Sequence, residues 1–315
     1  MPDALLAVEH LTKQFAVRNG VVRAVSDVSF DIATGETLGV IGESGCGKTT
    51  LSRLVLLAEP VTSGSIRYDG REMIGLSRKE AREFRRKVQV VFQDPFSSLN
   101  PRMRIGDIIS EPIVTHESLT QQEIQDRVAE LLTLVGLKPA MARLFPHEFS
   151  GGQRQRVAIA RALATHARLV VLDEPVSALD ASIRAHIINL LKSLQDRLGV
   201  SYLFIGHDLA TVVCISQRIA VMYLGRIVEL GPSTALVGQP LHPYTRALFA
   251  ASLPQHPDEK QEENIVRGEV PSAINPPSGC PYHPRCPVAI AKCREERPGL
   301  REIATGHQVA CHLAP

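Results

Sequence analysis

The sequence predicts an α/β protein in which a mainly parallel sheet is covered by helices. Between residues 166 and about 230, apolar strand-like segments alternate with helix-like segments, as in parallel α/β sheets. Residues 1 to about 92 contain further strand candidates, and residues 94 to about 165 show helical periodicity. Together these three regions predict one large α/β domain with an inserted helical part.

Apolar runs and alternating patterns locate the individual elements. Strand candidates before residue 93 are VVRAVSDVSFDI, TLGVIGES, GSIRYDG and KVQVVFQD. Thr120 and Glu123 form a capping-box pattern at the start of one helix, and a second helix begins near Ser150. The later elements are the strand LVVLDEP, a helix through RAHIINLLKSLQDRLG, the strand SYLFIGHD and RIAVMYLGRIVELG, a hairpin turning near Gly225.

Composition excludes several classes of protein. The 315 residues carry 35 Lys and Arg against 33 Asp and Glu, a net charge of +2 that gives no footprint for nucleic acid. The chain has no run of 18 apolar residues and no secretory signal pattern at its start, which predicts a cytosolic protein. Its six cysteines are therefore not expected to form disulfides.

A phosphate-binding loop is predicted after the strand TLGVI. Residues 42–49 match G-x-x-x-x-G-K-[ST], and a helix-like segment follows. We expect backbone amides and the helix N-terminus to bind the phosphates of ATP, Lys48 to reach them and Thr49 to ligate Mg²⁺. The helix N-terminus should also lower the pKa of Cys46. Residues expected to contact ATP here are Gly42, Glu43, Ser44, Gly45, Cys46, Gly47, Lys48, Thr49 and Thr50.

Two carboxylates follow the apolar strand at residues 169–172. A buried parallel strand would carry Asp173 and Glu174 to its C-terminal end, where α/β sheets place their ligands. We expect Asp173 to hold Mg²⁺ through water and Glu174 to orient the attacking water. An acidic strand end by itself is more often only solvated, so this hypothesis depends on the phosphate loop.

Ser150, Gly151, Gly152 and Gln153 follow Phe149 and precede a helix, and this segment resembles the LSGGQ signature of ABC ATPases. The resemblance implies that these four residues contact the ATP bound by a second chain. It also implies a coupling glutamine that reaches Mg²⁺, a D-loop ending in an aspartate, a switch histidine, and an aromatic ring on adenine. The matching positions are Gln93, Asp180, His207 and Phe15. For Phe15 a plain core role is the alternative.

Longer segments narrow the resemblance. VVFQDPFSSLNPR, FSGGQRQRVAIARAL, DEPVSALD and HPYTRAL, with a tail ending VACHL, look like the ATP-binding subunits of dipeptide/oligopeptide importers, of the second ATPase type. That implies a heterodimer with a second ATPase subunit, two membrane permease subunits and an extracytoplasmic substrate-binding protein, at the cytoplasmic face of the membrane. Nickel or glutathione as cargo, a homodimer and a non-transport ABC ATPase remain open alternatives.

The same resemblance implies the domain organisation. A RecA-like P-loop NTPase core with an antiparallel β subdomain and a helical signature subdomain, about 94–165, would make an ATPase domain over residues 1–235. A Cys-containing tail would follow over residues 236–315. The Pro-flanked segment 94–102, which contains Phe96 and Leu99, is expected to dock on a membrane subunit, with an ordinary exposed loop as the alternative.

Four of the cysteines lie in the tail, at Cys280, Cys286, Cys293 and Cys311. A short Pro-rich segment needs a staple, and four thiolates suit zinc, with His283, His307 and His312 near in sequence. The spacing lacks the close Cys pairs of zinc sites and fits a [4Fe–4S] cluster better, which the resemblance also implies. Metal-free thiols remain the third reading. We expect a structural role, because the tail is far in sequence from every ATP motif.

Overall fold

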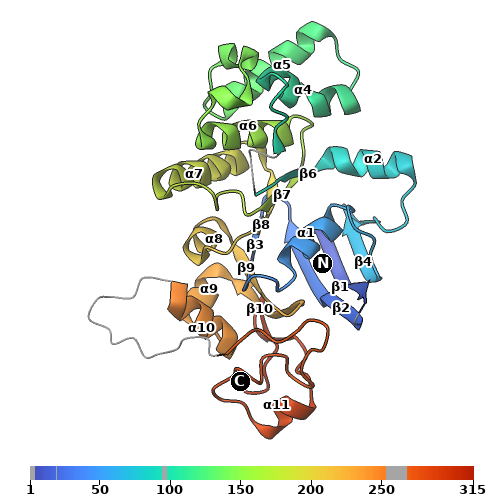
Figure 1. Ribbon diagram of the computed structural model, residues 1–315, viewed down its shortest axis with the longest axis vertical. Helices are drawn as coiled ribbons and strands as arrows, with labels where there is room; N and C mark the ends of the chain where they lie inside the picture. Colours follow the sequence, from blue (N-terminus) through green and yellow to red (C-terminus); the bar gives the residue numbers. More distant parts are fainter. Residues whose placement is uncertain (1–3, 19, 94–97, 253–267) are drawn as a thin grey trace. The chain divides into compact units, whose positions relative to one another are not determined.

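The computed structural model describes residues 4–18, 20–93, 98–252 and 268–315 (Figure 1). It divides into two compact units, each of which is described by itself. The first comprises residues 1–32, 37–74 and 204–315, and the second comprises residues 33–36 and 75–203. The tail therefore belongs to the same unit as the glycine loop.

Strands of the first unit are, in chain order, β1 (Ala4–Val17), β2 (Gly20–Ala33), β3 (Thr37–Ile41), β4 (Ser63–Tyr68), β5 (Arg71–Glu72), β9 (Arg218–Tyr223), β10 (Arg226–Pro232), β11 (Arg301–Ala304) and β12 (His307–Val309). Its helices are α1 (Lys48–Val55), α8 (Leu209–Ile215), α9 (Ser233–Gly238), α10 (Pro243–Ser252) and α11 (Ala291–Glu295). One further strand, β8 (Ser201–Ile205), crosses the boundary between the units.

The centre of the first unit is a mixed sheet. All five residues of β3 are buried, as expected for a parallel strand covered on both faces, and β3 pairs in parallel with β9. The predicted hairpin joins β9 to β10, and its turn residues Leu224 and Gly225 have φ of 43° and 75°. Two positive φ values in succession match the tight hairpin turn that suits the twist of the strands.

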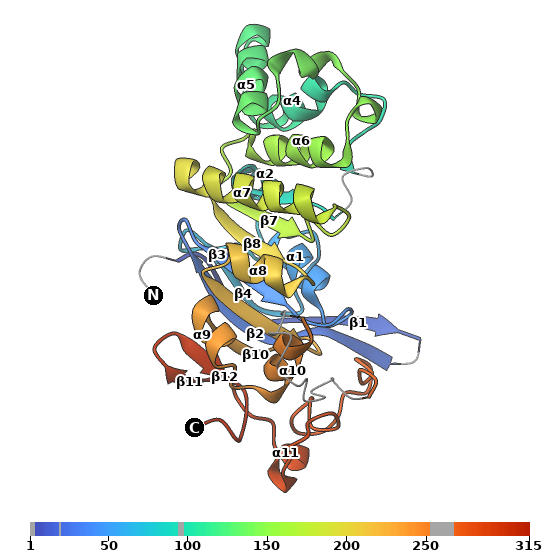
Figure 2. The same cartoon turned by 90° about the vertical axis from the view of Figure 1, so that its left-hand side faces the viewer.

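A second sheet supplies the predicted antiparallel part of this unit. Its strand order is β2-β1-β4-β5, and β1 pairs antiparallel with β4. Helices α8 and α9 pack on the mixed sheet, against β3 and against β9 and β10 respectively (Figure 2). The α/β fold class and the antiparallel sheet predicted from the sequence are thus confirmed.

Elements of the second unit are α2 (Arg78–Lys87), β6 (Val88–Val91), α4 (Ile105–His116), α5 (Gln121–Leu134), the 3₁₀ helices η1 (Pro139–Arg143) and η2 (Pro146–Glu148), α6 (Gly151–Leu163), β7 (Leu169–Asp173) and α7 (Ala181–Leu198). β6 and β7 pair in parallel. Helices α4, α5 and α6 pack together, as both views show. The predicted capping box starts α5 at Thr120, and the helix predicted to begin near Ser150 is α6, which a second capping box starts.

Two features of the fold were not expected. Helix α2 lies among the strands of the first 92 residues, although only Phe84 of its ten residues is buried. The tail is not irregular throughout, since β11 and β12 pair with each other and β12 pairs antiparallel with β10. Among the helices of the described residues, none is long and apolar enough to cross a membrane.

Candidate functional site

The glycine loop lies between β3 and α1, and its backbone can be built only with glycine at two positions. Gly42 and Gly47 have φ of 153° and 109°. A Cβ at Gly42 would lie 2.2 Å from the carbonyl oxygen of Met222, and one at Gly47 would lie 2.2 Å from that of Ala24. Side chains at these positions would close the loop, so the glycines keep an open cradle of backbone amides.

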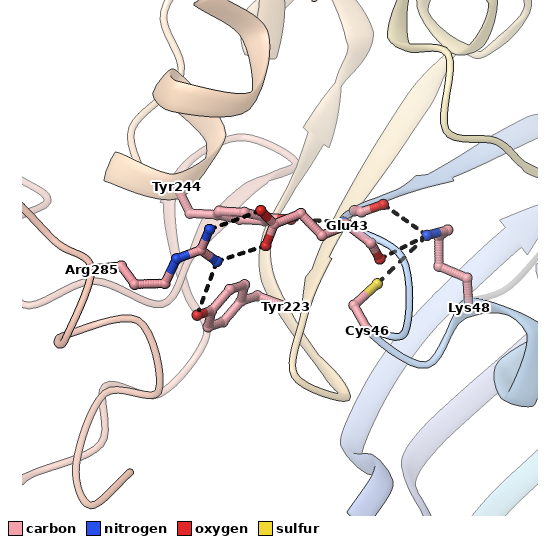
Figure 3. Close-up of polar contacts among 7 residues, drawn as sticks. Glu43, Cys46, Lys48, Tyr223, Tyr244 and Arg285 are labelled. Carbon is pink, nitrogen blue, oxygen red and sulfur yellow. Dashed lines mark hydrogen bonds and ion pairs between the residues drawn. The ribbon is translucent and has the colours of Figure 1, made fainter. Parts of the chain in front are cut away.

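Lys48 is the first residue of α1 and is 6% exposed. Its ammonium donates to the carbonyls of Gly42 at 2.7 Å and Glu43 at 3.0 Å (Figure 3). Thr49 follows on the exposed side of the same helical turn. A cation and a helix N-terminus therefore converge on one loop, which is the arrangement that binds anionic phosphate.

The turn of the β9–β10 hairpin holds this loop through backbone hydrogen bonds. The amide of Gly225 donates to the carbonyl of Cys46 at 2.8 Å, and the amide of Ser26 on β2 donates to the carbonyl of Gly225 at 2.8 Å. A Cβ at Gly225 would lie 2.9 Å from the carbonyl oxygen of Ala24. Residues about 180 positions apart in the chain thus hold the loop in place.

Cys46 behaves differently from the expectation drawn from its position. Its side chain is 2% exposed, and burial raises its pKa, while the positive charge of Lys48 offsets only part of that rise. The prediction that the helix N-terminus lowers this pKa is therefore wrong, because loss of hydration outweighs the helix field. At neutral pH Cys46 is a protonated, packed thiol.

Glu43 joins the loop to the C-terminal region, as Figure 3 shows. Its carboxylate accepts two hydrogen bonds from the Arg285 guanidinium, at 2.7 and 2.9 Å. Its amide donates to the Tyr244 hydroxyl at 2.9 Å. Arg285 also donates to the Tyr223 hydroxyl at 3.4 Å. The argument that the tail is remote because it is far in sequence from the ATP motifs is thereby wrong.

Phe15 lies near the end of β1 and is half-buried. The Lys13 ammonium sits 4.7 Å from the centre of its ring and donates to the carbonyl of Pro60 at 2.7 Å. The ring is accordingly not a fully buried core side chain, and part of it remains open to a ligand.

Gln93 and Glu174 come together in the second unit. The Gln93 amide donates to the Glu174 carboxylate at 3.0 Å. Asp173, the last residue of β7, is 8% exposed, whereas Glu174 is partly exposed. Glu174 has a φ of 51°, a left-handed conformation that costs a residue with a side chain about 1 kcal/mol and is frequent at functional sites. Ser177 stabilises that turn by donating to the carbonyl of Glu174 at 3.1 Å.

Ser150 and Gln153 stabilise the start of α6 reciprocally. The Ser150 hydroxyl accepts from the amide of Gln153 at 3.3 Å, and the Gln153 side chain accepts from the amide of Ser150 at 3.0 Å. A Cβ at Gly152 would lie 2.6 Å from Cγ2 of Ile183, whereas one at Gly151 would make an ordinary contact. The segment thus presents an exposed helix N-terminus whose second glycine is required by packing on α7.

Two further predicted residues lie on exposed turns. Asp180 immediately precedes α7, and its carbonyl accepts from the amide of Arg184 at 2.8 Å. His207 follows β8 in the first unit and is exposed. Both positions follow the end of a buried strand or turn, as the sequence indicates.

The predicted docking segment is only partly accessible. Residues 94–97, including Phe96, lie outside the described residues. Leu99 is 1% exposed, and the carbonyl of Ser98 accepts from Arg161 at 2.9 Å. The suggestion that Leu99 is offered to a partner is therefore wrong, since this side chain belongs to the core of the second unit.

The four tail cysteines gather in the first unit. Burial raises the pKa of Cys280 to about 11, and the nearby thiols of Cys293, Cys311 and Cys286 add to that rise. Cys280, Cys293 and Cys311 are buried, and Cys286 is partly exposed. In the described part of the chain, no group of three or more His, Cys, Asp or Glu side chains is arranged to hold a single metal ion.

Sequence reasoning missed the residues that reach the loop from far away. Arg285 and Tyr244 contact Glu43 across about 200 positions or more, and Tyr223 accepts from Arg285. Of these three, only Tyr244 lay in a segment that stood out, HPYTRAL, as a family motif without a role. Three features nevertheless come together as expected: a loop that only glycine can build, a buried lysine at the start of a helix, and a preceding buried parallel strand. These features define a P-loop nucleotide-binding protein.

Family models and solved structures agree with that class. A model described as ABC transporter matches residues 25–177, and one described as the C-terminal region of oligopeptide/dipeptide transporters matches residues 228–293. Among solved structures, the dimeric ATP-binding cassette MJ0796 bound to ADP and Pi is 28% identical with a TM-score of 0.66, over 72% of this chain and 98% of that one. CbiO1 from Clostridium perfringens is 30% identical with a TM-score of 0.68, over 75% and 92%.

Curated relatives match along almost the whole chain. A protein of Sinorhizobium fredii named "Probable peptide ABC transporter ATP-binding protein" is 52% identical, over 99% of this chain and 91% of that protein. The di/tripeptide transport ATP-binding protein DppF of Pseudomonas aeruginosa is 45% identical, and the oligopeptide transport ATP-binding protein AppF of Bacillus subtilis is 47% identical, each over 99% and 98%. The chain belongs to the family of ATP-binding subunits of peptide ABC transporters, and it is an ABC ATPase.

Proposed function

We propose that this chain binds and hydrolyses MgATP to energise the uptake of dipeptides or oligopeptides through partner membrane subunits. The observation that carries the nucleotide part is the cradle of Gly42 and Gly47 around the buried Lys48, in which any Cβ would strike backbone. The peptide part rests on relatives that are named for peptide transport and match both the ATPase region and the tail.

Each predicted site residue receives a proposed role. Loop residues 42–50 would bind the phosphates, and Phe15 would stack on adenine. Oxygen donors suit Mg²⁺, which would be held by Thr49, Gln93 and Asp173 and would neutralise phosphate charge. Glu174 would take up the proton of the attacking water and orient it, with Gln93 holding the carboxylate before reaction.

The remaining residues serve the dimer. His207 would sense the terminal phosphate, and Ser150, Gly151, Gly152 and Gln153 would meet the ATP held by a second subunit, beside Asp180. The exposed N-terminus of α6 supports this role because its amides and dipole favour an anion. We propose a heterodimer with a second ATPase subunit, docked on two permease subunits at the cytoplasmic face of the membrane and supplied by an extracytoplasmic binding protein. The ATPase domain would span residues 1–235 and the tail residues 236–315.

Co-purification tests this assembly directly. The tagged chain is isolated from its native membrane, the attached subunits are identified, and ATP hydrolysis by the complex is measured with the cognate binding protein. We expect two permeases and a second ATPase, and stimulation by peptides. Stimulation by nickel or glutathione instead of peptides would assign the cargo to the alternative class, and a complex without permeases would refute the transport role.

For the tail, we propose that Cys280, Cys286, Cys293 and Cys311 hold a [4Fe–4S] cluster. A zinc ion needs its sulfurs about 2.3 Å from one centre, whereas a cluster accepts four thiolates that are further apart. The cysteine spacing lacks the close Cys pairs typical of zinc sites, and it therefore fits the cluster better than zinc. The group would fix the tail fold. Anaerobic purification should yield a brown protein with about four irons per chain. One zinc ion per chain would instead assign the four cysteines to a zinc site. A protein without metal would show that they are metal-free thiols.

A further inference from the structure

Arg285 and Tyr244 connect the tail to the phosphate loop. We infer that Arg285 is a positioning residue for nucleotide binding: it neutralises and holds Glu43, and together with Tyr244 it fixes the first half of the phosphate loop. The inference rests on the proposed role of that loop in binding ATP. It assigns to the C-terminal region a role in shaping the phosphate loop.

The geometry is that of a strong, oriented ion pair. Both terminal nitrogens of Arg285 reach the Glu43 carboxylate, at 2.7 and 2.9 Å, so the two planar groups are fixed relative to each other (Figure 3). The Arg285 side chain is 5% exposed and that of Glu43 is 26% exposed. A guanidinium stays charged at all working pH values. Bidentate pairs of this kind specify position as well as energy.

Three tyrosine rings pack together beside the pair, and two of them bond to it or to the Glu43 amide. The rings of Tyr223 and Tyr244 have centroids 4.7 Å apart, and the ring of Tyr282 lies 5.3 Å from the first and 5.4 Å from the second. All three side chains are buried. A partly buried charge pair interacts more strongly than one at the surface, and loss of one partner leaves an uncompensated charge.

Electrostatics explains why the loop needs such a partner. Glu43 places a carboxylate beside a loop that binds anionic phosphate, and like charges would oppose the nucleotide. Arg285 cancels that charge, and it also draws the carboxylate toward the tyrosines. The Glu43 amide is meanwhile bonded to Tyr244, so its direction is fixed by the tail. Both effects should lower the cost of binding ATP.

The tail segment that carries Arg285 is itself tightly folded. The amide of Arg285 donates to the carbonyl of Tyr282 at 3.0 Å, and the amide of Cys280 donates to the carbonyl of Cys293 at 2.8 Å. Arg285 is therefore held on a turn between two cysteines. The residue that contacts the phosphate loop is therefore carried by a hydrogen-bonded, folded segment of the tail.

A charge-removal cycle tests the inference. Nucleotide affinity is measured for the full-length chain as wild type, Arg285→Gln, Glu43→Gln and the double variant. We expect Arg285→Gln to weaken MgATP binding about tenfold, because Glu43 is left charged and unpaired. The double variant should recover most of that loss. Unchanged affinity in Arg285→Gln, or no recovery in the double variant, would overturn the inference.

The matched control breaks another ion pair of the same unit. Arg218 donates to the Asp31 carboxylate at 3.3 Å, and both side chains are 24% exposed. Arg218→Gln should lower thermal stability without changing affinity for MgATP. If Arg285→Gln fails to fold, Arg285→Lys provides the test, since it keeps the positive charge but cannot make two parallel hydrogen bonds to Glu43. We expect its affinity for MgATP to lie between that of wild type and a loss of about tenfold. Failure of the wild type to bind any nucleotide would instead refute the proposed function.

A second measurement reads the loop itself without nucleotide. Cys46 is buried inside the loop, so alkylation requires local opening, and peptide mass spectrometry distinguishes it from the other cysteines. Labelling of Cys46 should become several-fold faster in Arg285→Gln and stay unchanged in Arg218→Gln. Equal labelling in wild type and Arg285→Gln would show that the tail does not hold the loop.

Discussion

The phosphate loop and the signature segment at residues 150–153 are both helix N-termini suited to phosphate, but they are held in different ways. Ser150 and Gln153 hold each other, within four residues. The phosphate loop is held by the β9–β10 turn through Gly225 and by the tail through Arg285, both far away in sequence. The signature segment is therefore stabilised locally, whereas the phosphate loop depends on two distant parts of the chain.

The largest effect should come from Glu174, at the turn after β7. Glu174→Gln keeps the side-chain volume and the contact with Gln93, but it removes the carboxylate that takes up a proton. We expect steady-state ATP hydrolysis to fall by at least about 100-fold while ATP binding remains.

This measurement uses the assembled transporter with the partner subunit's own site silenced. Gln93→Glu is a second variant to measure, because it replaces the amide that donates to Glu174 at 3.0 Å by another carboxylate. It should also lower Mg²⁺-dependent ATP hydrolysis, but it leaves the Glu174 carboxylate in place. Substantial hydrolysis in Glu174→Gln would assign the catalytic base elsewhere.

Glycine substitutions compare the two helix N-termini directly. In Gly47→Ala the new Cβ meets the backbone carbonyl of Ala24 at 2.2 Å in a left-handed conformation, so neither partner can move cheaply. We expect a loss of about 3 kcal/mol in the free energy of unfolding. In Gly152→Ala the new Cβ meets Cγ2 of the Ile183 side chain at 2.6 Å, which can shift where a backbone carbonyl cannot, and a smaller loss of about 2 kcal/mol is expected.

Chemical denaturation of both variants decides the comparison. Gly75, whose added Cβ would meet nothing within 4 Å, gives a control in the second unit for the cost of positive φ alone. Equal losses in Gly47→Ala and Gly152→Ala would show that the loop is no more constrained than the signature.

Features of the fold that depend on local sequence patterns could be predicted, whereas those that depend on distant contacts could not. The glycine loop, the capping box at Thr120, the helix start at Ser150 and the hairpin at Gly225 are local patterns, and all four were found at the expected places. Helix α2 was missed because it is almost entirely polar, although Ser77 and Glu80 form a capping box that the sequence already displays. Strands of three or four residues in the tail depend on pairing with the edge of β10, which no local pattern records.

Contacts within the site are likewise of two kinds, those that strand pairing makes predictable and those that no sequence pattern indicates. Gln93 and Glu174 each follow an apolar strand, and parallel pairing of β6 with β7 brings those strand ends together, so their meeting was foreseeable. The bond from Arg285 to Glu43 spans 242 positions and has no periodic signal. For Cys46, position predicted a lowered pKa, but burial, which only the fold determines, raises it.

Ser150→Ala tests whether the signature is more than a helix cap. Thr120 caps α5 with the same reciprocal pair of bonds, so Thr120→Ala is its matched control. Each substitution should cost about 1 kcal/mol of unfolding free energy. Only Ser150→Ala should also reduce ATP hydrolysis in the assembled dimer. If the two variants lose activity equally, Ser150 acts as a cap alone.

The smallest effect concerns Cys46 and its pH dependence. Burial raises the pKa of this thiol above its ordinary value of 9.0, so folding favours the protonated form. Its contribution to stability is thus fully present below about pH 9 and is lost as the pH rises above that value, because only the unfolded chain then releases the proton. Cys46→Ser removes this dependence, and comparing its unfolding free energy with wild type across that range measures it.

Thiolate is the reactive form, so alkylation of Cys46 should keep accelerating beyond about pH 9, and bound MgATP should protect it. A labelling rate that levels off below about pH 8 would mean that the helix N-terminus outweighs burial after all.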